Sequence, residues 1–501
     1  MWSIREACRD IINACWREGA NLDTLGGIAK GLKQCVANLT RWNMSVFGLI
    51  PKQIQKKRRA LSELVVQNRD GSRGNEVNKL RKEINELLDN EEIMRHHRAK
   101  TQWLGFGDRN TKYFHSMASE RRKKNTIIGL CDEEGRYCET TEDIANIVVS
   151  YFEKLCTTSL PTWIAEVTNS IPTRVTEEMN QSLIREFTKE EVKATLHQMH
   201  PTIALGPDGM LAIFYQKYWD IVGNDVTSMV LNVLNSNLSM AKINRTNITL
   251  VPKTKNPIRM TEFRLIILSN VIYELISKVL ANRLKTILPQ IILEIQSVFL
   301  FECLITDNVL VAFELTHYLD HKRDGKDYNM TVKLDMSKAC DGVERGFIEK
   351  IMEHMGFHER WINLIMHCIT TMTYSILING VAHLSIILTR GLQQGDPLSS
   401  YLFLLCADGF SSLINKAARN KMLNGVSICR GCPMVTHLFF TNDSLLFCKA
   451  SRQECQKIVE IHELYKVSYG QKINADKSSV FFSHNTPNDT RSEVLEILGP
   501  M

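Results

Sequence analysis

A fifteen-residue stretch near the C-terminal end, Met434 to Cys448, most limits what this chain can fold into. Its sequence is MVTHLFFTNDSLLFC, in which two apolar runs flank the polar tip Thr441-Asn442-Asp443-Ser444. Apolar runs of this length around an Asn-Asp pair predict a tight β-hairpin with buried arms. Taken alone, the Asn-Asp pair is ordinary turn chemistry, so the rest of the chain must decide whether it does more.

Size and composition place the chain among globular proteins without a membrane span. It has 501 residues, of which 44% are hydrophobic and 23% charged, and this length allows about two to four domains. The longest uninterrupted apolar run, Tyr401 to Ala407, is too short to cross a bilayer. Because the N-terminus carries charges from its first turn, it does not resemble a secretory signal. We therefore expect an intracellular protein with no membrane contact.

The 14 cysteines are scattered along the chain, which favours reduced thiols over a disulfide framework. One CxxC motif occurs, Cys429-Arg430-Gly431-Cys432. A zinc site needs a second pair of ligands at suitable spacing. His437 alone does not supply that pair, so the sequence argues against zinc.

Positive charge is concentrated in one region. The net charge is +6, yet residues 51–130 contain 19 Lys or Arg against 10 Asp or Glu. Such a region suggests contact with a polyanion, nucleic acid first, although a solvated helix surface explains the charge equally well. Between Trp103 and Asn125, aromatic residues that could stack on bases alternate with cations that could neutralise phosphates. The candidate cations are Arg109, Lys112, Arg121, Arg122, Lys123 and Lys124.

Hydrophobic spacing predicts a helical N-terminal half followed by mixed helices and strands. An antiparallel helical pair is expected after Pro51, and a strand over 331–335. A hairpin is expected to turn at Asn379-Gly380. A helix capped by Ser269 or Asn270 would turn Arg283 away from its buried stripe and end at Pro289. The strands and helices follow no βαβ rhythm, so the fold class is α+β.

Acidic residues stand at two predicted strand ends. Asp335 ends the strand over 331–335, and Asp443 lies at the hairpin tip beside Asn442. Nucleotidyl transfer by two divalent metals, about 3.5–4 Å apart, needs carboxylates from different strands. Mg²⁺ prefers oxygen ligands and keeps several waters. A strand-end Asp beside a hairpin-tip acid could supply that arrangement.

The motifs occur in the order found in one known family. The chain resembles the reverse transcriptase of plant LINE-type (non-long-terminal-repeat) retrotransposons over nearly its whole length, most densely from Trp103 onward. The resemblance implies a right-hand polymerase core of fingers, palm and thumb, a two-ion Mg²⁺ site, an RNA template, a DNA primer and a deoxynucleoside triphosphate. The matching segments are GDRNTKYFHS (107–116), GPDGM (206–210), LSNVIYELISKVLANRLK (268–285), LITDNVLVAFE (304–314), VKLDMSKA (332–339), QQGDPLS (393–399), HLFF–DSLLFCKA (437–450) and GQKINADKSS (470–479).

The resemblance also assigns roles to single residues. Asp335 and Asp443 match catalytic, metal-binding aspartates. Gln394 and Gly395 match the loop that contacts the incoming nucleotide and the template. Arg264 matches the fingers arginine expected near the triphosphate. Lys477 matches the basic residue of the motif after the hairpin, and both are predicted to bind the nucleotide.

Departures from the family argue against activity. Asn442 stands where the family has an Asp that ligates both metals, so three carboxylates fall to two. Cys340 replaces an aromatic ring that is expected to exclude a ribose 2′-hydroxyl. Leu265 and Arg345 replace a Pro and a Trp, and are candidate structural lesions. Further replacements are Gln393 for an Arg, Ile203 for a Lys, and Glu302-Cys303 for a Gly-Arg.

The sequence predicts three regions: a helical basic extension (1–130), a helical linker (131–235), and fingers and palm (236–501). We expect the endonuclease and thumb of the family to be absent. The leading hypothesis is a degenerate RNA-directed DNA polymerase homologue with little or no activity. The alternatives are a non-catalytic nucleic-acid-binding protein or a relic that does not fold stably. The oligomeric state stays open.

Overall fold

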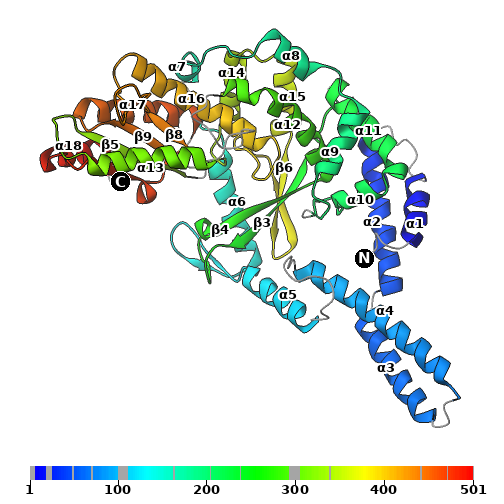
Figure 1. Ribbon diagram of the computed structural model, residues 1–501. Coiled ribbons are helices and arrows are strands. Elements are labelled where there is room, and N and C mark those ends of the chain that lie inside the picture. Colours follow the sequence, from blue (N-terminus) through cyan, green and yellow to red (C-terminus); the bar gives the residue numbers. More distant parts are fainter. Residues whose placement is uncertain are drawn as a thin grey trace.

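The computed structural model describes residues 6–17, 25–47, 50–68, 72–99, 111–161, 164–202, 205–236, 238–292, 305–337, 340–440, 443–470 and 472–499. Two main β-sheets are surrounded by helices in this part of the chain, and a helical region precedes them (Figure 1). Mixed, mostly antiparallel sheets with segregated helices make an α+β fold, as the sequence predicts.

Five helices are described in the N-terminal region. Trp16 ties the first of them to the main body, because its indole N–H donates to Asp225 Oδ2 at 2.7 Å. The predicted helical pair is confirmed: α3 and α4 lie side by side and project away from the body, with Ile54 and Ile84 buried (Figure 1). The helices are α1 (Glu6–Arg17), α2 (Leu25–Phe47), α3 (Ile50–Gln67), α4 (Gly74–Ala99) and α5 (Thr111–Asn125).

A second helical group leads to the sheets. Two helices of this group start at capping threonines: Thr140 accepts a hydrogen bond from Asp143 N–H, and Thr188 forms a capping box with Glu191. Each cap satisfies backbone groups that a helix start would otherwise leave unpaired. The elements are β1 (Leu130–Cys131), β2 (Tyr137–Cys138), α6 (Thr141–Cys156), α7 (Ile164–Thr168), α8 (Glu177–Ile184), α9 (Lys189–Gln198), α10 (Ala212–Lys217) and α11 (Trp219–Ser236).

The first sheet has the strand order β4-β3-β6-β7, from β4 (Phe263–Ser269), β3 (Arg245–Pro252), β6 (Thr373–Ile378) and β7 (Val381–Ile386). Leu265, a candidate lesion, lies opposite Leu250 in a β3–β4 ladder that runs without interruption along β4. The predicted turn between β6 and β7 is confirmed: Asn379 and Gly380 have φ of 52° and 87°, the positive values that a tight type I′ hairpin turn requires.

Helix α12 (Val271–Ile291) corrects two expectations. Pro289 does not end the helix but lies inside its last turn. Arg283 does not face outward: it is 6% exposed and donates to Glu191 Oε2 at 2.8 Å and to the carbonyl oxygens of Leu183, Arg185 and Glu186. A buried guanidinium with its donors satisfied holds the α8–α9 segment against α12.

Asn270 precedes α12, but its side chain does not cap the helix. Its amide instead joins distant segments, accepting from Asp208 N–H at 3.0 Å and donating to the Ile243 carbonyl at 2.8 Å. Gly206 makes this approach possible, because a Cβ there would lie 2.2 Å from the Ser269 carbonyl oxygen. The turn over 206–209 is therefore fastened to the start of α12.

The second sheet contains the expected hairpin. Strand β5 (Asn329–Ser337) pairs antiparallel with β9 (Asp443–Lys449), and β9 pairs with β8 (His437–Phe439). Strands β10 (Lys472–Ile473) and β11 (Ser479–Phe482) pair with β5 on its other side. The remaining helices are α13 (Ile305–His321), α14 (Arg345–Met355), α15 (Glu359–Thr370), α16 (Ser399–Arg419), α17 (Arg452–Tyr469) and α18 (Asn488–Leu498).

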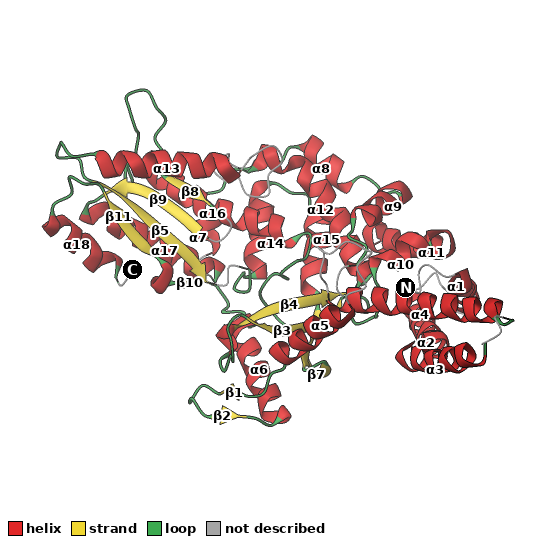
Figure 2. Ribbon diagram, turned by 60° about the horizontal axis from the view of Figure 1, so that its bottom comes forward, coloured by secondary structure: helices red, strands yellow, loops and turns green. Residues whose placement is uncertain are grey.

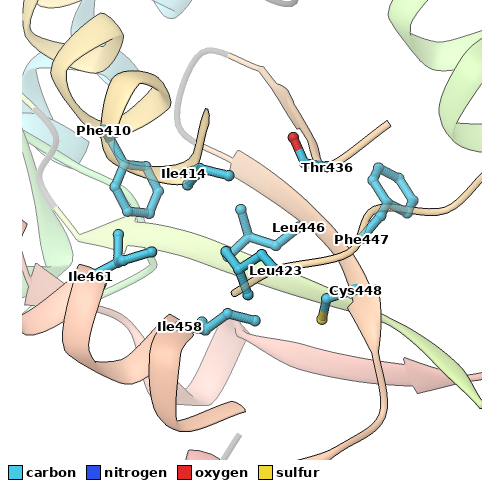
Figure 3. Close-up of a pocket in the computed structure, with 9 residues that line it drawn as sticks. All are labelled: Phe410, Ile414, Leu423, Thr436, Leu446, Phe447, Cys448, Ile458 and Ile461. Atoms are coloured by element: carbon cyan, nitrogen blue, oxygen red, sulfur yellow. The ribbon is translucent and has the colours of Figure 1, made fainter. Parts of the chain in front are cut away.

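Helices cover both faces of this sheet (Figure 2). Leu438 and Phe447 pack with Leu315 and Leu319 of α13 on one side. On the other side, Leu446 lines a small cavity of about 10 Å³ between the sheet, α16 and α17, whose lining is apolar except for Thr436 and Cys448 (Figure 3). Such a cavity holds at most about one water, and its lining offers that water few polar partners. It is therefore a packing gap in the core, not a binding site.

Arg345, the other candidate lesion, is built into the core. It is 6% exposed, and its guanidinium donates to the carbonyl oxygens of Leu388 at 2.6 Å and Gly391 at 3.4 Å. Burial holds the pKa of this arginine below its usual range. The hydrogen bonds offset part of the desolvation of the charge, so the described fold accommodates the substitution.

No described helix is both long and apolar enough to span a membrane. The described cysteines form no disulfide. The division into three regions remains a prediction. Helices α8 to α11 contribute residues to the same hydrophobic core as α12.

Leu446→Ala should destabilise the fold by about 2–5 kcal/mol, because it enlarges an existing void that the core cannot easily close. Leu446 is 4% exposed and lies opposite Val332. Leu495→Ala on α18, where the side chain is 41% exposed, is the matched control and should cost less than about 1 kcal/mol. Urea unfolding measures both. Equal losses would contradict the packing of β9 against α16 and α17.

Candidate metal and nucleotide site

Two aspartates face each other across the second sheet. Asp335 of β5 and Asp443 of β9 are directly opposed in the antiparallel register, which places their Cβ atoms about 4.5–5.5 Å apart on one face. Their neighbours show which face that is, since Leu334 is buried while Lys333 and Asp335 are half-buried. Both carboxylates therefore stand above the sheet, on the side not buried against α16 and α17.

A turn after α17 fixes the backbone of Asp335. Its N–H donates to Ser478 Oγ at 3.2 Å, and its carbonyl accepts from Asn474 N–H at 2.9 Å. The Ser478 hydroxyl donates to the Asn474 carbonyl at 2.8 Å and closes the ring. Lys477 lies in this turn, in the short 3₁₀ helix η3 (Ala475–Lys477), and is exposed. The clamp uses only the main chain of Asp335 and leaves its carboxylate available for a ligand.

The two oxygens of Asp443 differ in their surroundings. Oδ2 lies 3.6 Å from Lys333 Nζ in an ion pair whose side chains are 41% and 42% exposed. Exposed pairs of this kind are worth little. Oδ1 is buried and has no hydrogen-bond partner among the described residues. Since an unpartnered buried carboxylate oxygen is costly, this atom is placed where a cation would satisfy it.

The donor set fits a hard divalent cation. Mg²⁺ is held by one or two carboxylates plus waters and substrate phosphates, which Asp335 and Asp443 could provide from neighbouring strands. No described cluster of three or more His, Cys, Asp or Glu residues could hold a metal. Asn442, the degenerate position, lies outside the described residues, so its predicted effect on the site remains a prediction.

The loop over 390–396 packs against the segment that follows β5. Leu392 N–H donates to the Cys340 carbonyl at 2.8 Å, and Gly391 N–H to the Val343 carbonyl at 2.7 Å. Gly391 has φ of 92°, and a Cβ there would lie 2.8 Å from the Asp341 carbonyl oxygen. Burial, followed by the nearby Asp341, raises the pKa of Cys340 to about 11. Cys340 is thus a neutral thiol beside the predicted nucleotide loop.

Gln394 and Gly395 form the exposed tip of that loop, and Gly395 has φ of 85°. Their neighbours are buried anchors. Gln393 Nε2 donates to Ser269 Oγ at 3.0 Å, and Asp396 Oδ1 accepts from the Ser277 hydroxyl at 2.6 Å. These bonds tie the loop to the end of β4 and to α12, so the structure brings the tip into one region with α12 and the segment after β5.

The sequence does not predict most of the contacts that hold Asp335 and the loop in place. Ser478 and Asn474 lie within the motif GQKINADKSS, and Asp396 within QQGDPLS, but neither motif shows which side chains turn inward. Lys333 lies two residues before Asp335. Strand alternation could have placed it on the face of the aspartates.

The remaining predicted residues lie further from the candidate site or outside the described residues. Arg264 is exposed on the first sheet, five residues and roughly 17 Å along β4 from Ser269. Arg121, Arg122, Lys123 and Lys124 are exposed at the end of α5, where Lys124 pairs with Glu120 at 2.9 Å. Arg109 and the side chain of Lys112 lie outside the described residues.

Buried acids surround the anchors of the loop. Ser269 Oγ donates to Glu274 Oε1 at 2.7 Å. Burial raises the pKa of Glu274 to about 7, the Ser269 bond opposes this rise, and the nearby Asp396 and Asp208 add to it. Burial likewise raises the pKa of Asp208 to about 6 and holds that of Asp396 above its usual range. The stability of the contacts between the loop, α12 and the 206–209 turn should therefore depend on whether these three acids are protonated.

Residues 251–499 match the family model described as reverse transcriptase (RNA-dependent DNA polymerase). Over 384 residues the chain is 24% identical to the transposon TX1 uncharacterized 149 kDa protein of Xenopus laevis, covering 76% of this chain and 29% of that protein. It is 33% identical over 133 residues to the retrovirus-related Pol polyprotein from the type-1 retrotransposable element R2 of Popillia japonica, covering 26% and 21%.

A shorter relative is covered almost fully. The chain is 30% identical over 115 residues to an uncharacterized mitochondrial protein of Arabidopsis thaliana, which covers 22% of this chain and 90% of that protein. In contrast, the chain spans less than a third of the length of the TX1 and R2 proteins.

Glu274→Gln should flatten the pH dependence of stability between about pH 4.5 and 7. The folded-state pKa of Glu274 is raised from 4.5 to about 7, so its stabilising effect is complete below the unfolded value and lost as pH rises through the folded one. The difference is on the order of 2–3 kcal/mol. Glutamine keeps the oxygen that accepts from Ser269 but does not titrate.

Urea unfolding at several pH values measures this change. Part of the slope should remain, because Asp208 still titrates. The control is Glu496→Gln, at an exposed position on α18, which should leave the slope unaltered. A slope that persists in full in the Glu274→Gln variant would overturn the assignment.

Proposed function

We propose that this chain, a member of the reverse transcriptase family by its match over residues 251–499 and by the non-LTR retrotransposon proteins among its relatives, is an RNA-directed DNA polymerase homologue of LINE type. Its Asp335–Asp443 pair would descend from a two-metal nucleotidyl-transfer site. The observation that carries the proposal is the opposed pair itself, in which Asp443 Oδ1 has no hydrogen-bond partner among the described residues.

The chemistry is attack of a primer 3′-hydroxyl on a deoxynucleoside triphosphate, directed by an RNA template. Bound Mg²⁺ would supply positive charge to the triphosphate and the developing oxyanion. Asp335 and Asp443 would hold it. The main-chain clamp from Asn474 and Ser478 keeps Asp335 in position, because catalysis by charge placement depends on groups that are already fixed.

The nucleotide would lie beside the loop tip. Gln394 and Gly395 are exposed there on buried anchors, and Cys340 contacts the same loop through its carbonyl. The small thiol of Cys340 would exclude a ribose 2′-hydroxyl poorly. Roles for Arg264 and Lys477 at the triphosphate belong to the proposal. Lys477 is an exposed cation in the turn that holds the Asp335 main chain, whereas Arg264 is exposed further away on β4.

The same site argues for weak or absent activity in this copy. A neutral amide at position 442 leaves two carboxylates to balance two divalent ions and a triphosphate. Lys333 competes for the charge of Asp443 by lying 3.6 Å from it. We propose that the metal site is impaired by this loss of negative charge, while the fold around it is kept.

The chain as written should not extend an oligo(dT) primer on poly(A) with Mg²⁺ and TTP. Asn442→Asp should produce measurable extension, because it restores the third carboxylate. Asn442→Asp combined with Asp335→Asn is the control and should again be inactive. Template-dependent extension by the unaltered chain would contradict the proposed impairment. Extension by the double variant would contradict the role of Asp335.

A second candidate function is nucleic-acid binding without catalysis. The observation that favours it is the run of exposed cations in the last turn of α5. Cations in such a run can neutralise phosphates without any metal site. This function would survive loss of the polymerase chemistry, and it is separable by experiment.

Replacing Arg121 and Arg122 by Gln should weaken RNA binding and reduce the slope of log K against log salt by up to about 1.4 for single strands. The matched control replaces Lys416 and Arg419, two exposed cations in the last turn of α16. Filter binding at several salt concentrations measures both. Equal slopes for the two double variants would reject α5 as the RNA contact.

A further inference from the structure

A closed loop between α16 and β8 carries the CxxC motif. Its base is a two-way backbone bridge, in which Val426 and Val435 exchange N–H···O bonds of 2.9 and 3.0 Å. Val426 is 2% exposed and packs in the small core with Leu438 and Phe447. The loop therefore leaves the body and returns to it at one fixed point.

Inside the loop, a tight turn brings the two thiols together. Cys432 N–H donates to the Cys429 carbonyl at 3.2 Å, and Gly431 has φ of 89°. The Ser427 hydroxyl lies within hydrogen-bond distance of both cysteine carbonyls, at 2.9 and 3.1 Å. As a result, Cys429 Sγ and Cys432 Sγ are 3.0 Å apart. The hydrogen bonds of the surrounding turn hold the two thiols in contact.

Exposure separates this pair from the other described thiols. Cys429 and Cys432 are exposed, whereas the other described cysteines are buried or half-buried. Cys15 and Cys35 also contact each other, but both are buried, and burial raises the pKa of Cys35 to about 12. Because the thiolate is the reactive species and must be reached by its reagent, Cys429 and Cys432 are the most accessible to solution oxidants among the described cysteines.

The donor count argues against a metal at this loop. Two sulfurs supply half of a tetrahedral zinc site, and no described cluster of three or more His, Cys, Asp or Glu residues could complete it. The hydrogen bond between the thiols raises the pKa of Cys429, which follows from their contact.

We propose that Cys429 and Cys432 form a dithiol site that reacts with low-molecular-weight disulfides and closes to an intramolecular disulfide. The thiolate of one cysteine attacks a sulfur of the small disulfide, forming a mixed disulfide and expelling one small thiolate. The second cysteine then attacks the protein sulfur of the mixed disulfide and expels the other. The two cysteines lose two electrons and two protons, and the small disulfide is reduced to two thiols.

The second step should be fast because the thiols are already in contact. An exposed disulfide in a surface turn belongs to the labile, reversible kind, so excess dithiothreitol should reopen it. The site does not depend on polymerase activity, since its loop lies outside the Asp335–Asp443 pair. Its test therefore fails or succeeds separately from the proposed function.

The test treats the reduced full-length chain with oxidised glutathione and records intact mass and alkylation of each cysteine. The native chain should lose the mass of two hydrogens, retain no glutathione, and protect Cys429 and Cys432 from iodoacetamide. Cys429→Ser and Cys432→Ser should each retain one glutathione, because no second thiol resolves the adduct. Circular dichroism checks that both variants are folded.

A stable glutathione adduct at Cys429 or Cys432 of the native chain would overturn the proposal, because it would show that the second thiol does not resolve the first. Continued alkylation of both cysteines after treatment would overturn it as well. The buried pair provides an internal control, since Cys15 and Cys35 should not react in either form until the chain is unfolded.

Discussion

The antiparallel register between β5 and β9 determines where the chemistry of the second sheet can occur. It sets Asp335 opposite Asp443 and Leu334 opposite Ser444. A slip of one residue would send every side chain of a strand to the other face. The register is held from both faces, by Leu446 against α16 and α17 and by Phe447 with α13. The same register therefore fixes both the packing of the core and the positions of the two aspartates.

Local features of the fold could be predicted from sequence because they depend on neighbouring residues. The Asn379-Gly380 turn, the Thr188 capping box and the strand that ends near Asp335 follow from residue type and spacing. Long-range contacts could not be predicted in this way. Arg283 and Arg345 are polar residues that the chain buries because distant carbonyls meet them, and a single sequence does not show those partners.

In the candidate site too, local features could be predicted from sequence and long-range contacts could not. Strand alternation and the hairpin were enough to propose that Asp335 and Asp443 meet. The clamp on Asp335 and the anchors Gln393 and Asp396 were not foreseen, because they depend on which side chains of a loop turn inward. The predicted nucleotide loop over 390–396 thus rests on the end of β4, on α12 and on the segment after β5 together, and buried acids with raised pKa values lie at that joint.

We expect a preserved fold around a metal site that has lost negative charge. Manganese binding, followed by electron paramagnetic resonance of the free ion, tests this most directly because it requires no catalysis. Asn442→Asp should bind Mn²⁺ more tightly than the unaltered chain, by on the order of tenfold or more, since a carboxylate replaces an amide ligand. Asp443→Asn should bind it more weakly. Equal affinities in all three proteins would contradict the assignment of Asp335 and Asp443 as the metal-binding pair.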